Sequence, residues 1–476
     1  MDSLPVALIG LPGAVEPELN RSLADRSGRS LVALDDWPGN DRPLLMSVPL
    51  DRLADSDVRG RLRGRALAVW IDGADQALAR RSGRSPQDIA RLRKRHLVDL
   101  TTTADAIVGL ADDLHGDGAG EDLAGRLVAA IAGANHPGAS RVVTETVTFA
   151  DGRSYPVHVG RGVIELLPEL VPDRAKKVAV ITQESIGLEV DSGREQRTFL
   201  VEDGERAKRL EEIGRLGSAL ARWELTRADV IVSVGGGVVS DLAGFLAASY
   251  HRGVPVIHVS TTLLGQIDAA IGGKCGVNLP EGKNLLGAFW QPTAVLCDID
   301  SLSTLPPREF VSGMGELAKY HFLGGGMLDR VPLVDRVARS ARIKANVVSG
   351  DEREGGRRAI LNYGHTLAHA LETAGRYDLR HGEAVAIGLV YAAELAHRLG
   401  RIDADRVAEH RRVVARYGLE STYAGDADHD EIVDLFQRDK KAIEGTTFVL
   451  DGPNGVEPVR IDDRTLLLDT LSCVSR

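Results

Sequence analysis

Short apolar runs recur through the first two-thirds of the chain, and each ends in a polar or glycine-rich loop. They occupy residues 6–9 and 66–71 near the start, and residues 178–182, 230–234 and 254–259 further on. Runs of this length without polar alternation are typical of strands buried on both faces of a sheet. Because helical patterns separate the runs, the chain is expected to alternate strand and helix around parallel sheets, the α/β class.

Beyond about Pro306 the apolar residues recur with a helical period, in segments rich in Ala, Leu, Arg and Glu that continue to Gly418. A polar, turn-forming stretch at residues 133–138 is the best candidate for a boundary upstream. The pattern predicts three parts: an α/β domain at 1–138, a nucleotide-binding α/β domain at 139–305 and a mostly helical domain at 306–476.

Charge and composition narrow the possible partners. The 476 residues include 58 Lys and Arg against 68 Asp and Glu, a net charge of −10. This balance argues against a nucleic-acid partner or an anionic membrane, although a small anion can still bind a local cluster of cations. No secretory signal and no apolar run of about 20 residues is visible, so a cytoplasmic protein without a membrane segment is expected. Cys275, Cys297 and Cys473 are spaced neither for a disulfide framework nor for a structural zinc site.

A glycine triplet follows the apolar run at 230–234. Gly235, Gly236 and Gly237 leave no side chain between backbone N–H groups and a phosphate, and the helix expected after them adds a positive dipole. A tight strand-to-helix turn without a ligand explains the triplet about equally well. The spacing is not that of the G-x-G-x-x-G fingerprint, so it does not indicate a standard Rossmann site.

Two lysines lie downstream in what read as glycine- and asparagine-rich loops. Lys274 follows two glycines, and Lys283 stands between Gly282 and Asn284. A point charge on flexible backbone suits a phosphate. Solvated lysines are the ordinary alternative, but two at this spacing in apolar surroundings favour an anion site.

Three segments supply possible metal ligands. They contain Glu316, then His365 and His369 one helical turn apart, and then His381. Two imidazoles and one carboxylate leave an open position on a zinc-like ion, as a catalytic site requires. Spacing alone favours His365 and His369 as the pair, but it does not settle which two histidines bind metal.

From about Val142 onward these residues resemble the 3-dehydroquinate synthase family. The resemblance rests on seven motifs in this order: Gly-Gly-Gly-Val-Val-Ser-Asp at 235–241, Gly-Gly-Lys-Cys-Gly-Val-Asn at 272–278, Gly-Lys-Asn at 282–284, Gly-Met-Gly-Glu-Leu-Ala-Lys at 313–319, Leu-Asn-Tyr-Gly-His-Thr-Leu-Ala-His at 361–369, His-Gly-Glu-Ala-Val-Ala at 381–386 and Asp-Lys-Lys at 439–441. They span roughly two-thirds of the chain. Cys275 stands where the family usually has Thr, and Ala368 where Gly is commoner; neither change removes a charge or a ligand.

The resemblance implies an NAD-binding α/β domain, a helical metal- and substrate-binding domain, and a homodimer. The reaction would convert 3-deoxy-D-arabino-heptulosonate 7-phosphate, an anionic sugar phosphate, by transient oxidation with NAD beside a zinc or cobalt ion. The implied metal ligands are Glu316, His365 and His381, which overrides the spacing argument for His369. The implied cofactor contacts are Glu205, Lys208, Gly235, Gly236, Gly237, Val238, Asp241, Thr261, Thr262, Asp268, Lys274 and Lys283. The implied substrate contacts are Asp268, Lys274, Asn284, Lys319, Lys344, Arg358, Asn362, His369, one of Lys440 and Lys441, and Arg252 reaching from a neighbouring subunit.

Two rival enzyme classes share parts of this pattern. A metal-dependent alcohol dehydrogenase has the same two-domain plan but needs no dense set of anion-binding residues. The residues that count against it are Lys274, Lys283, Asn284, Lys344 and Arg358. A valiolone-type sugar-phosphate cyclase acts on substrates without a carboxylate, so Arg358 and Asn362 favour the dehydroquinate reaction.

The first third resembles a degenerate shikimate kinase. The strand and loop at 6–14 match the start of a P-loop, but Glu16 and Pro17 stand where Lys and Ser or Thr should hold phosphate and Mg²⁺. We therefore expect residues 1–138 to keep a kinase-like fold without phosphoryl transfer; residual shikimate kinase activity is the alternative.

Overall fold

The computed structural model describes most of the chain. The residues outside its description are 1–4, 13, 16, 28, 38–43, 63–64, 73–74, 110–122, 124–126, 129–140, 376–377, 425–427 and 439–445. The chain forms two compact units: unit 1 is Met1–Arg141 with Asp329–Arg336, and unit 2 is Val142–Leu328 with Val337–Arg476. The boundary predicted at 133–138 lies outside the described residues.

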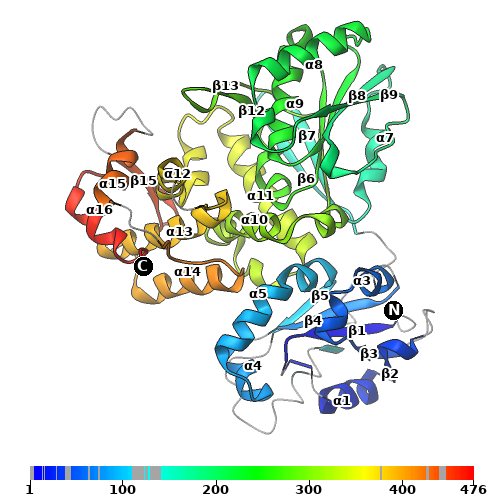
Figure 1. Cartoon of the computed structure of the whole chain (residues 1–476), viewed down its shortest axis with the longest axis vertical. Coiled ribbons are helices and arrows are strands. Elements are labelled where there is room, and N and C mark those ends of the chain that lie inside the picture. Colours follow the sequence, from blue (N-terminus) through cyan, green and yellow to red (C-terminus); the bar gives the residue numbers. More distant parts are fainter. Residues whose placement is uncertain are drawn as a thin grey trace. The chain divides into compact units, whose positions relative to one another are not determined.

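Unit 1 contains a parallel sheet whose described strands run in the order β2-β3-β1-β4-β5 (Figure 1). Its strands are β1 (Val6–Gly10), β2 (Ser30–Ala33), β3 (Leu44–Ser47), β4 (Leu67–Asp72) and β5 (Ala106–Gly109). Its helices are α1 (Pro17–Ser27), α2 (Leu50–Leu53), α3 (Ser56–Leu62), α4 (Asp75–Ser82) and α5 (Pro86–Thr103). The two predicted strands are β1 and β4, which pair directly at the centre of the sheet. The prediction of a parallel α/β domain is confirmed.

Unit 2 begins with a larger sheet, in the order β6-β7-β14-β11-β10-β8-β9 over the described residues. The strands are β6 (Val143–Thr148), β7 (Ser154–Gly160), β8 (Lys177–Gln183), β9 (Glu195–Val201), β10 (Val230–Gly235), β11 (Val256–Ser260) and β14 (Ala294–Asp298). Only the β6–β7 pair in this sheet is antiparallel. The chain forms β6 and β7 at one edge, then β8 and β9 at the other, and fills the middle from β10 through β11 to β14, which pairs with β7.

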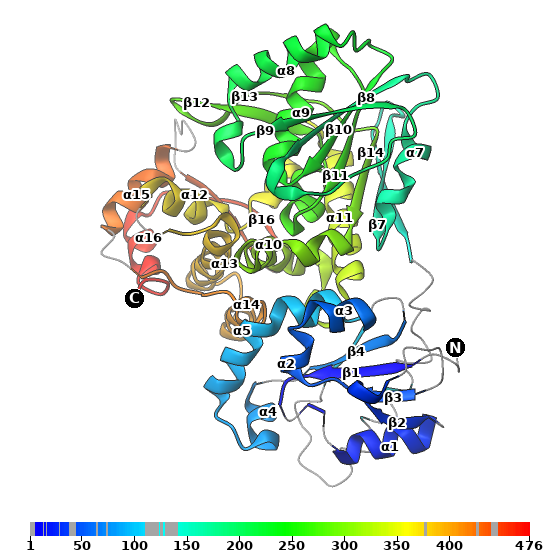
Figure 2. The ribbon, with the colours of Figure 1, turned by 45° about the vertical axis from the view of Figure 1, so that its right-hand side comes forward.

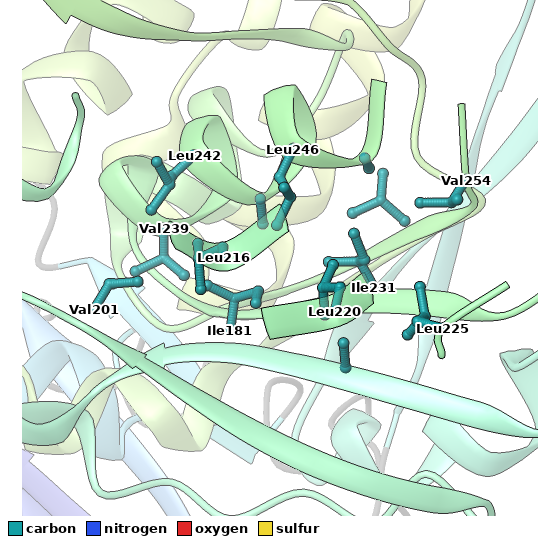
Figure 3. Packing of buried hydrophobic residues seen from close by; sticks show 14 of the residues in the cluster. Ile181, Val201, Leu216, Leu220, Leu225, Ile231, Val239, Leu242, Leu246 and Val254 are labelled. Carbon is teal, nitrogen blue, oxygen red and sulfur yellow. The ribbon is translucent and has the colours of Figure 1, made fainter. Parts of the chain in front are cut away.

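The apolar runs are uninterrupted because the sheet is covered on both faces. On one face α8 (Leu210–Arg222) and α9 (Gly237–Ser249) pack onto alternate residues such as Ile181 and Ile231 (Figure 3). On the other face α7 (Leu167–Leu170) packs onto the intervening residues, Val180 and Val232 among them. Each strand therefore needs apolar side chains at every position, not at every second one.

A two-stranded antiparallel hairpin, β12 (Lys274–Leu279) and β13 (Gly282–Phe289), lies in the chain between β11 and β14. The sequence interpretation of these residues as loops is wrong. Gly276 pairs with Gly287 in the hairpin, and a Cβ on Gly287 would lie 2.2 Å from the Cys275 carbonyl oxygen. The strands thus approach too closely for side chains at this point, which removes the apolar pattern by which strands are predicted.

The rest of unit 2 is mostly helical, as predicted. Its helices are α10 (Pro307–Tyr320), α11 (Leu333–Gly350, which begins within the segment of unit 1), α12 (His365–Ala374), α13 (His381–Arg398), α14 (Ala404–Arg416), α15 (His429–Arg438) and α16 (Arg464–Leu471). A small hairpin of β15 (Thr446–Leu450) and β16 (Glu457–Ile461) was not predicted. Helix α13 is buried along most of its length. It packs against α10 and α12, which lie beside it in Figure 2. Among the described residues, no helix is both long and apolar enough to cross a membrane.

Candidate active site

The glycine triplet forms the turn from β10 into α9. Helix α9 begins at Gly237 and has no acidic residue in its first turn, so its positive end is not neutralised. A Cβ on Gly236 would lie 2.7 Å from the Thr262 methyl carbon, so this glycine is also required by packing. Thr261 and Thr262 follow β11, and the Thr261 N–H donates to the Gly235 carbonyl (3.0 Å).

This turn lies where an open α/β sheet normally binds its ligand. The chain order reverses between β8 and β10, and β10 carries Gly235 at its carboxyl end. Ligands of such sheets bind outside the carboxyl ends of the strands at this reversal. Turn, helix start and sheet topology together suit a dinucleotide phosphate.

A lysine-centred cluster lies beside α9. Lys208 is buried and donates to the Asp241 carboxylate (2.7 Å) and to the Asn284 side-chain oxygen (2.5 Å). Asn278 donates to Glu205 (2.7 Å) and accepts from the Asn284 N–H (2.8 Å), which ties hairpin β12–β13 to the same cluster. Asn284, predicted to contact substrate, thus lies with the predicted cofactor residues Glu205, Lys208 and Asp241.

Three predicted metal ligands converge in the helical part. Glu316 of α10, His365 at the start of α12 and His381 at the start of α13 place their ligand atoms within 4.8 Å of one another. The Nε2 atoms of both histidines lie 3.2 Å from Oε1 of the fully buried Glu316. Two imidazoles and one carboxylate that leave room for a further ligand fit a divalent ion such as zinc. His369 is nearby, with its ring centroid 5.4 Å from that of His365.

Hydrogen bonds on the far side of each ring orient the two histidines. Nδ1 of His365 donates to the Tyr363 carbonyl (3.2 Å), and Nδ1 of His381 lies 3.4 Å from the Glu372 carboxylate. In each case the Nε2 atom is directed toward Glu316, as expected for metal-binding histidines.

Lys319 forms an ion pair with Glu316 one turn away on α10. Burial alone would raise the pKa of Glu316, but the charges of Lys319 and His365 outweigh it and hold that pKa well below its usual value. Glu316 is therefore kept as a carboxylate.

A second lysine–carboxylate pair joins Lys344 to Asp268, which lies in the segment after β11. Lys344 of α11 bonds to the carboxylate of Asp268 and, at 2.6 Å, to its carbonyl oxygen. The Tyr320 hydroxyl donates to the same carboxylate (3.1 Å). Burial lowers the pKa of Lys344 to about 8. Burial would raise the pKa of Asp268, but the charges of Lys344 and Lys319 lower it to about 2.

Lys274 and Arg358 belong to a further group of charged residues, which includes Glu354. Lys274 opens β12 and donates to Glu354 (2.5 Å), whose carboxylate also bonds the Asn362 side chain. Arg358 is buried and donates to the carbonyls of Glu352 (2.6 Å) and Gly272 (3.0 Å). Both terminal nitrogens of its guanidinium therefore bond to backbone, so a substrate would have to use their remaining N–H groups.

Some predicted residues lie apart from these clusters. Lys283 is exposed on β13, and its charge acts on Glu372 beside the metal group, not on the cofactor turn. Arg252 is exposed in the turn after α9, where its backbone is left-handed (φ 62°). Lys440 and Lys441 lie outside the described residues.

Sequence reasoning missed two carboxylates of the site. Glu372 was detectable, because His365, His369 and Glu372 follow a 4-then-3 spacing that places all three on one face of α12. Glu354 was not, because it lies in a loop 80 residues from its partner Lys274.

A phosphate-binding turn and a Glu-His-His group in one unit define a nucleotide- and metal-dependent enzyme with the fold of the sugar-phosphate cyclases. The model of the 3-dehydroquinate synthase N-terminal domain matches residues 198–312, and that of the C-terminal domain matches residues 313–442. The chain belongs to the 3-dehydroquinate synthase family.

Relatives support this assignment over most of their own length. A protein of Amycolatopsis mediterranei (strain S699), provisionally named aminodehydroquinate synthase, is 48% identical over 68% of this chain and 93% of its own. The 3-dehydroquinate synthase of Arthrobacter sp. (strain FB24) is 44% identical over 62% of this chain and 89% of its own. A solved 2-deoxy-scyllo-inosose synthase, complexed with carbaglucose-6-phosphate, NAD⁺ and Co²⁺, matches 69% of this chain and 99% of its own with a TM-score of 0.61 and 28% identity.

Proposed function

We propose that the chain converts 3-deoxy-D-arabino-heptulosonate 7-phosphate to 3-dehydroquinate and phosphate, with NAD and a divalent metal ion as cofactors. The observation that carries the proposal is the convergence of Glu316, His365 and His381 beside the pairs formed by Lys319 and Lys344. A substrate with a carboxylate, a phosphate and several hydroxyls needs cations and a metal ion together, and the site offers both.

Two groups of residues would hold the cofactors, the Glu-His-His group and the glycine turn before α9. Glu316, His365 and His381 would hold the metal ion, and the turn at Gly235, Gly236, Gly237 and Val238 would hold the NAD phosphates, with Glu205, Lys208 and Asp241 on its adenosine side. When bound, NAD takes up and returns a hydride, and the metal ion polarises substrate oxygens. The solved 2-deoxy-scyllo-inosose synthase, which contains NAD⁺ and Co²⁺, supports this pairing of cofactors.

The lysines bind the substrate by exchanging partners. Lys274, Lys319 and Lys344 are each paired with a carboxylate, so an incoming anion would replace that carboxylate as the partner. Asp268, released from Lys344, then accepts a hydrogen bond from a substrate hydroxyl. Once the partners are exchanged, the lysines and carboxylates hold the substrate groups in a defined orientation.

Phosphate release tests the proposal. Purified protein with NAD, zinc and the heptulosonate phosphate is expected to release phosphate and form the carbocycle. Glu316→Ala is expected to abolish metal binding and turnover together, whereas Glu394→Gln, which removes a carboxylate bonded to Arg411 (2.7 Å) outside the site, retains both. Turnover only with sedoheptulose 7-phosphate would instead indicate a valiolone-type cyclase.

An amino-substituted version of the reaction is a second candidate. The relative provisionally named aminodehydroquinate synthase is more similar to this chain (48% identity) than the 3-dehydroquinate synthase of Arthrobacter sp. (44%). Comparing kcat/KM for the heptulosonate phosphate with that for its analogue carrying an amino group in place of a hydroxyl separates the two functions.

For unit 1 we propose a shikimate-kinase-like fold without phosphoryl transfer. Strand β1 leads through Gly10 into a loop and α1, as a P-loop begins, but Arg93 occupies the acidic strand end: it donates to Asp72 (2.5 Å) and Asp75 (2.9 Å). A buried guanidinium in that position takes the place of a divalent cation. The full chain with ATP, Mg²⁺ and shikimate is expected to form no ADP above the rate without shikimate; shikimate-dependent ADP formation would overturn the proposal.

We propose domains at 1–138, 139–305 and 306–476, a cytoplasmic location, and a homodimer in which Arg252 reaches the partner's substrate. Light scattering on the purified chain tests the dimer, and a monomer that retains full activity would refute it.

A further inference from the structure

Three aromatic residues form a buried cluster behind the metal group. His410 of α14 stacks on Phe322, with ring centroids 3.6 Å apart and an interplanar angle of 4°, and it meets Tyr363 edge-on. Tyr363 and His410 are fully buried, and Phe322 nearly so. We call these three residues the aromatic cluster; none of them was singled out for the site by its sequence.

The hydrogen bonds of His410 fix both its tautomer and the position of Tyr363. Nδ1 of His410 lies 2.8 Å from the Arg406 carbonyl, which can only accept, so Nδ1 carries the proton. Nε2 is then the acceptor for the Tyr363 hydroxyl at 2.8 Å. Burial lowers the pKa of His410 to about 4, so the ring stays neutral and Nε2 stays an acceptor at neutral pH.

The aromatic cluster joins the two segments that carry metal ligands. Phe322 lies two residues beyond the end of α10 and six residues after Glu316, and Tyr363 lies two residues before His365. The Tyr363 carbonyl accepts the Nδ1 proton of His365 and so directs Nε2 of that ring toward Glu316. A shift of the Tyr363 peptide would therefore rotate a metal ligand.

We infer that His410 is a positioning residue for the metal site: by holding the Tyr363 hydroxyl and stacking on Phe322, it fixes the His365 ring relative to Glu316. The inference rests on the metal site of the proposed function. His410 touches neither metal ligand and acts through Tyr363 and Phe322 alone.

The test compares two buried tyrosines that each lose one hydroxyl. Tyr363→Phe removes the bond to His410, and Tyr391→Phe removes a bond from α13 to the Leu467 carbonyl (3.2 Å), as a matched control. Zinc affinity is measured by calorimetry, and the Co²⁺ form is examined by visible absorption. Tyr363→Phe is expected to weaken zinc binding about tenfold, the lower end for losing an outer-shell partner, and to change the Co²⁺ spectrum. Tyr391→Phe is expected to lower Tm but leave both metal readouts unchanged.

Substitutions of His410 complete the test. His410→Gln retains an acceptor for the Tyr363 hydroxyl and is expected to bind zinc more tightly than His410→Leu. His410→Leu removes both the acceptor and the stacking on Phe322, so it is expected to weaken zinc binding at least as much as Tyr363→Phe, and the double variant to be no weaker than His410→Leu alone, because the shared bond is already lost. If His410→Leu does not fold, the comparison of Tyr363→Phe with Tyr391→Phe decides.

Each outcome has a separate meaning. Wild-type zinc affinity and an unchanged Co²⁺ spectrum in Tyr363→Phe, with only a lower Tm, would overturn the inference and leave the proposed function intact. A wild-type protein that binds no zinc would instead refute the metal site itself.

Discussion

At the scale of single residues, the candidate site pairs its positive charges internally. Lys208, Lys274, Lys319 and Lys344 each bond to a carboxylate of the same site. The sequence predicted lysines placed for anions, but it could reveal only the Glu316–Lys319 pair, which lies within one helical turn. The partners of Lys274 and Lys344 are 80 and 76 residues away, and only the fold brings them together.

The charge state of Lys344 predicts a pH dependence. Burial lowers its pKa to about 8, and the charges around it come from Asp268, Arg358 and Lys319. Below pH 8 the amine is charged and can bind an anion; above pH 8 it is neutral. We therefore expect kcat/KM, which reports the free enzyme, to fall above an apparent pKa of about 8.

Lys344→Arg provides the control for this assignment. Because arginine keeps its charge to a pKa above about 12, the variant is expected to lose the alkaline decrease whatever its absolute rate. An identical decrease in the variant and the wild type would show that another group titrates.

Glu372 predicts an effect on metal binding. Its carboxylate lies 3.4 Å from Nδ1 of His381, so Glu372→Gln is expected to weaken zinc binding about 10- to 100-fold. Calorimetric zinc titration measures the change, with Glu394→Gln as the control on α13. Equal zinc affinity in both variants would contradict a role for Glu372 in orienting the histidine.

At the scale of elements, the metal group exists because α10 and α13 touch through their backbones. Gly315 and Gly382 are the chain neighbours of Glu316 and His381, and a Cβ on Gly382 would lie 1.6 Å from the Ser312 carbonyl oxygen. Helical periodicity predicted this helical region, and the glycines beside the ligands were visible in the sequence. Their purpose was not visible, because contact between helices 65 residues apart leaves no local pattern.

Gly382→Ala tests this contact. The new methyl group would force the helices apart, so we expect the free energy of unfolding to fall by at least about 3 kcal/mol, the upper end of ordinary overpacking, with loss of zinc binding. Denaturant unfolding and zinc titration measure the two effects.

Gly214→Ala on α8 is the matched control, because a Cβ there would have no atom within 4 Å. It is expected to stabilise the protein by about 0.5–1 kcal/mol, as alanine does in a helix interior. Normal stability and zinc affinity in Gly382→Ala would show that the close contact of α10 and α13 is not required.

At the scale of the whole molecule, the net charge of −10 and the anionic substrate are compatible. In the proposed function, lysines that already have carboxylate partners exchange them for the substrate, so the site would need no excess positive charge. The order of the motifs indicated the two-part enzyme of unit 2, and the motifs at 235–241, 361–369 and 381–386 contain the starts of α9, α12 and α13. The five-stranded sheet of unit 1 was less accessible, since only β1 and β4 have long apolar runs.

The most direct test of the account is release of phosphate from 3-deoxy-D-arabino-heptulosonate 7-phosphate by the purified full chain. With NAD and zinc we expect one phosphate per carbocycle formed, no net NADH, and no release after zinc is removed with a chelator. Absence of phosphate release with both cofactors bound, or release that continues in Glu316→Ala, would contradict the central claim.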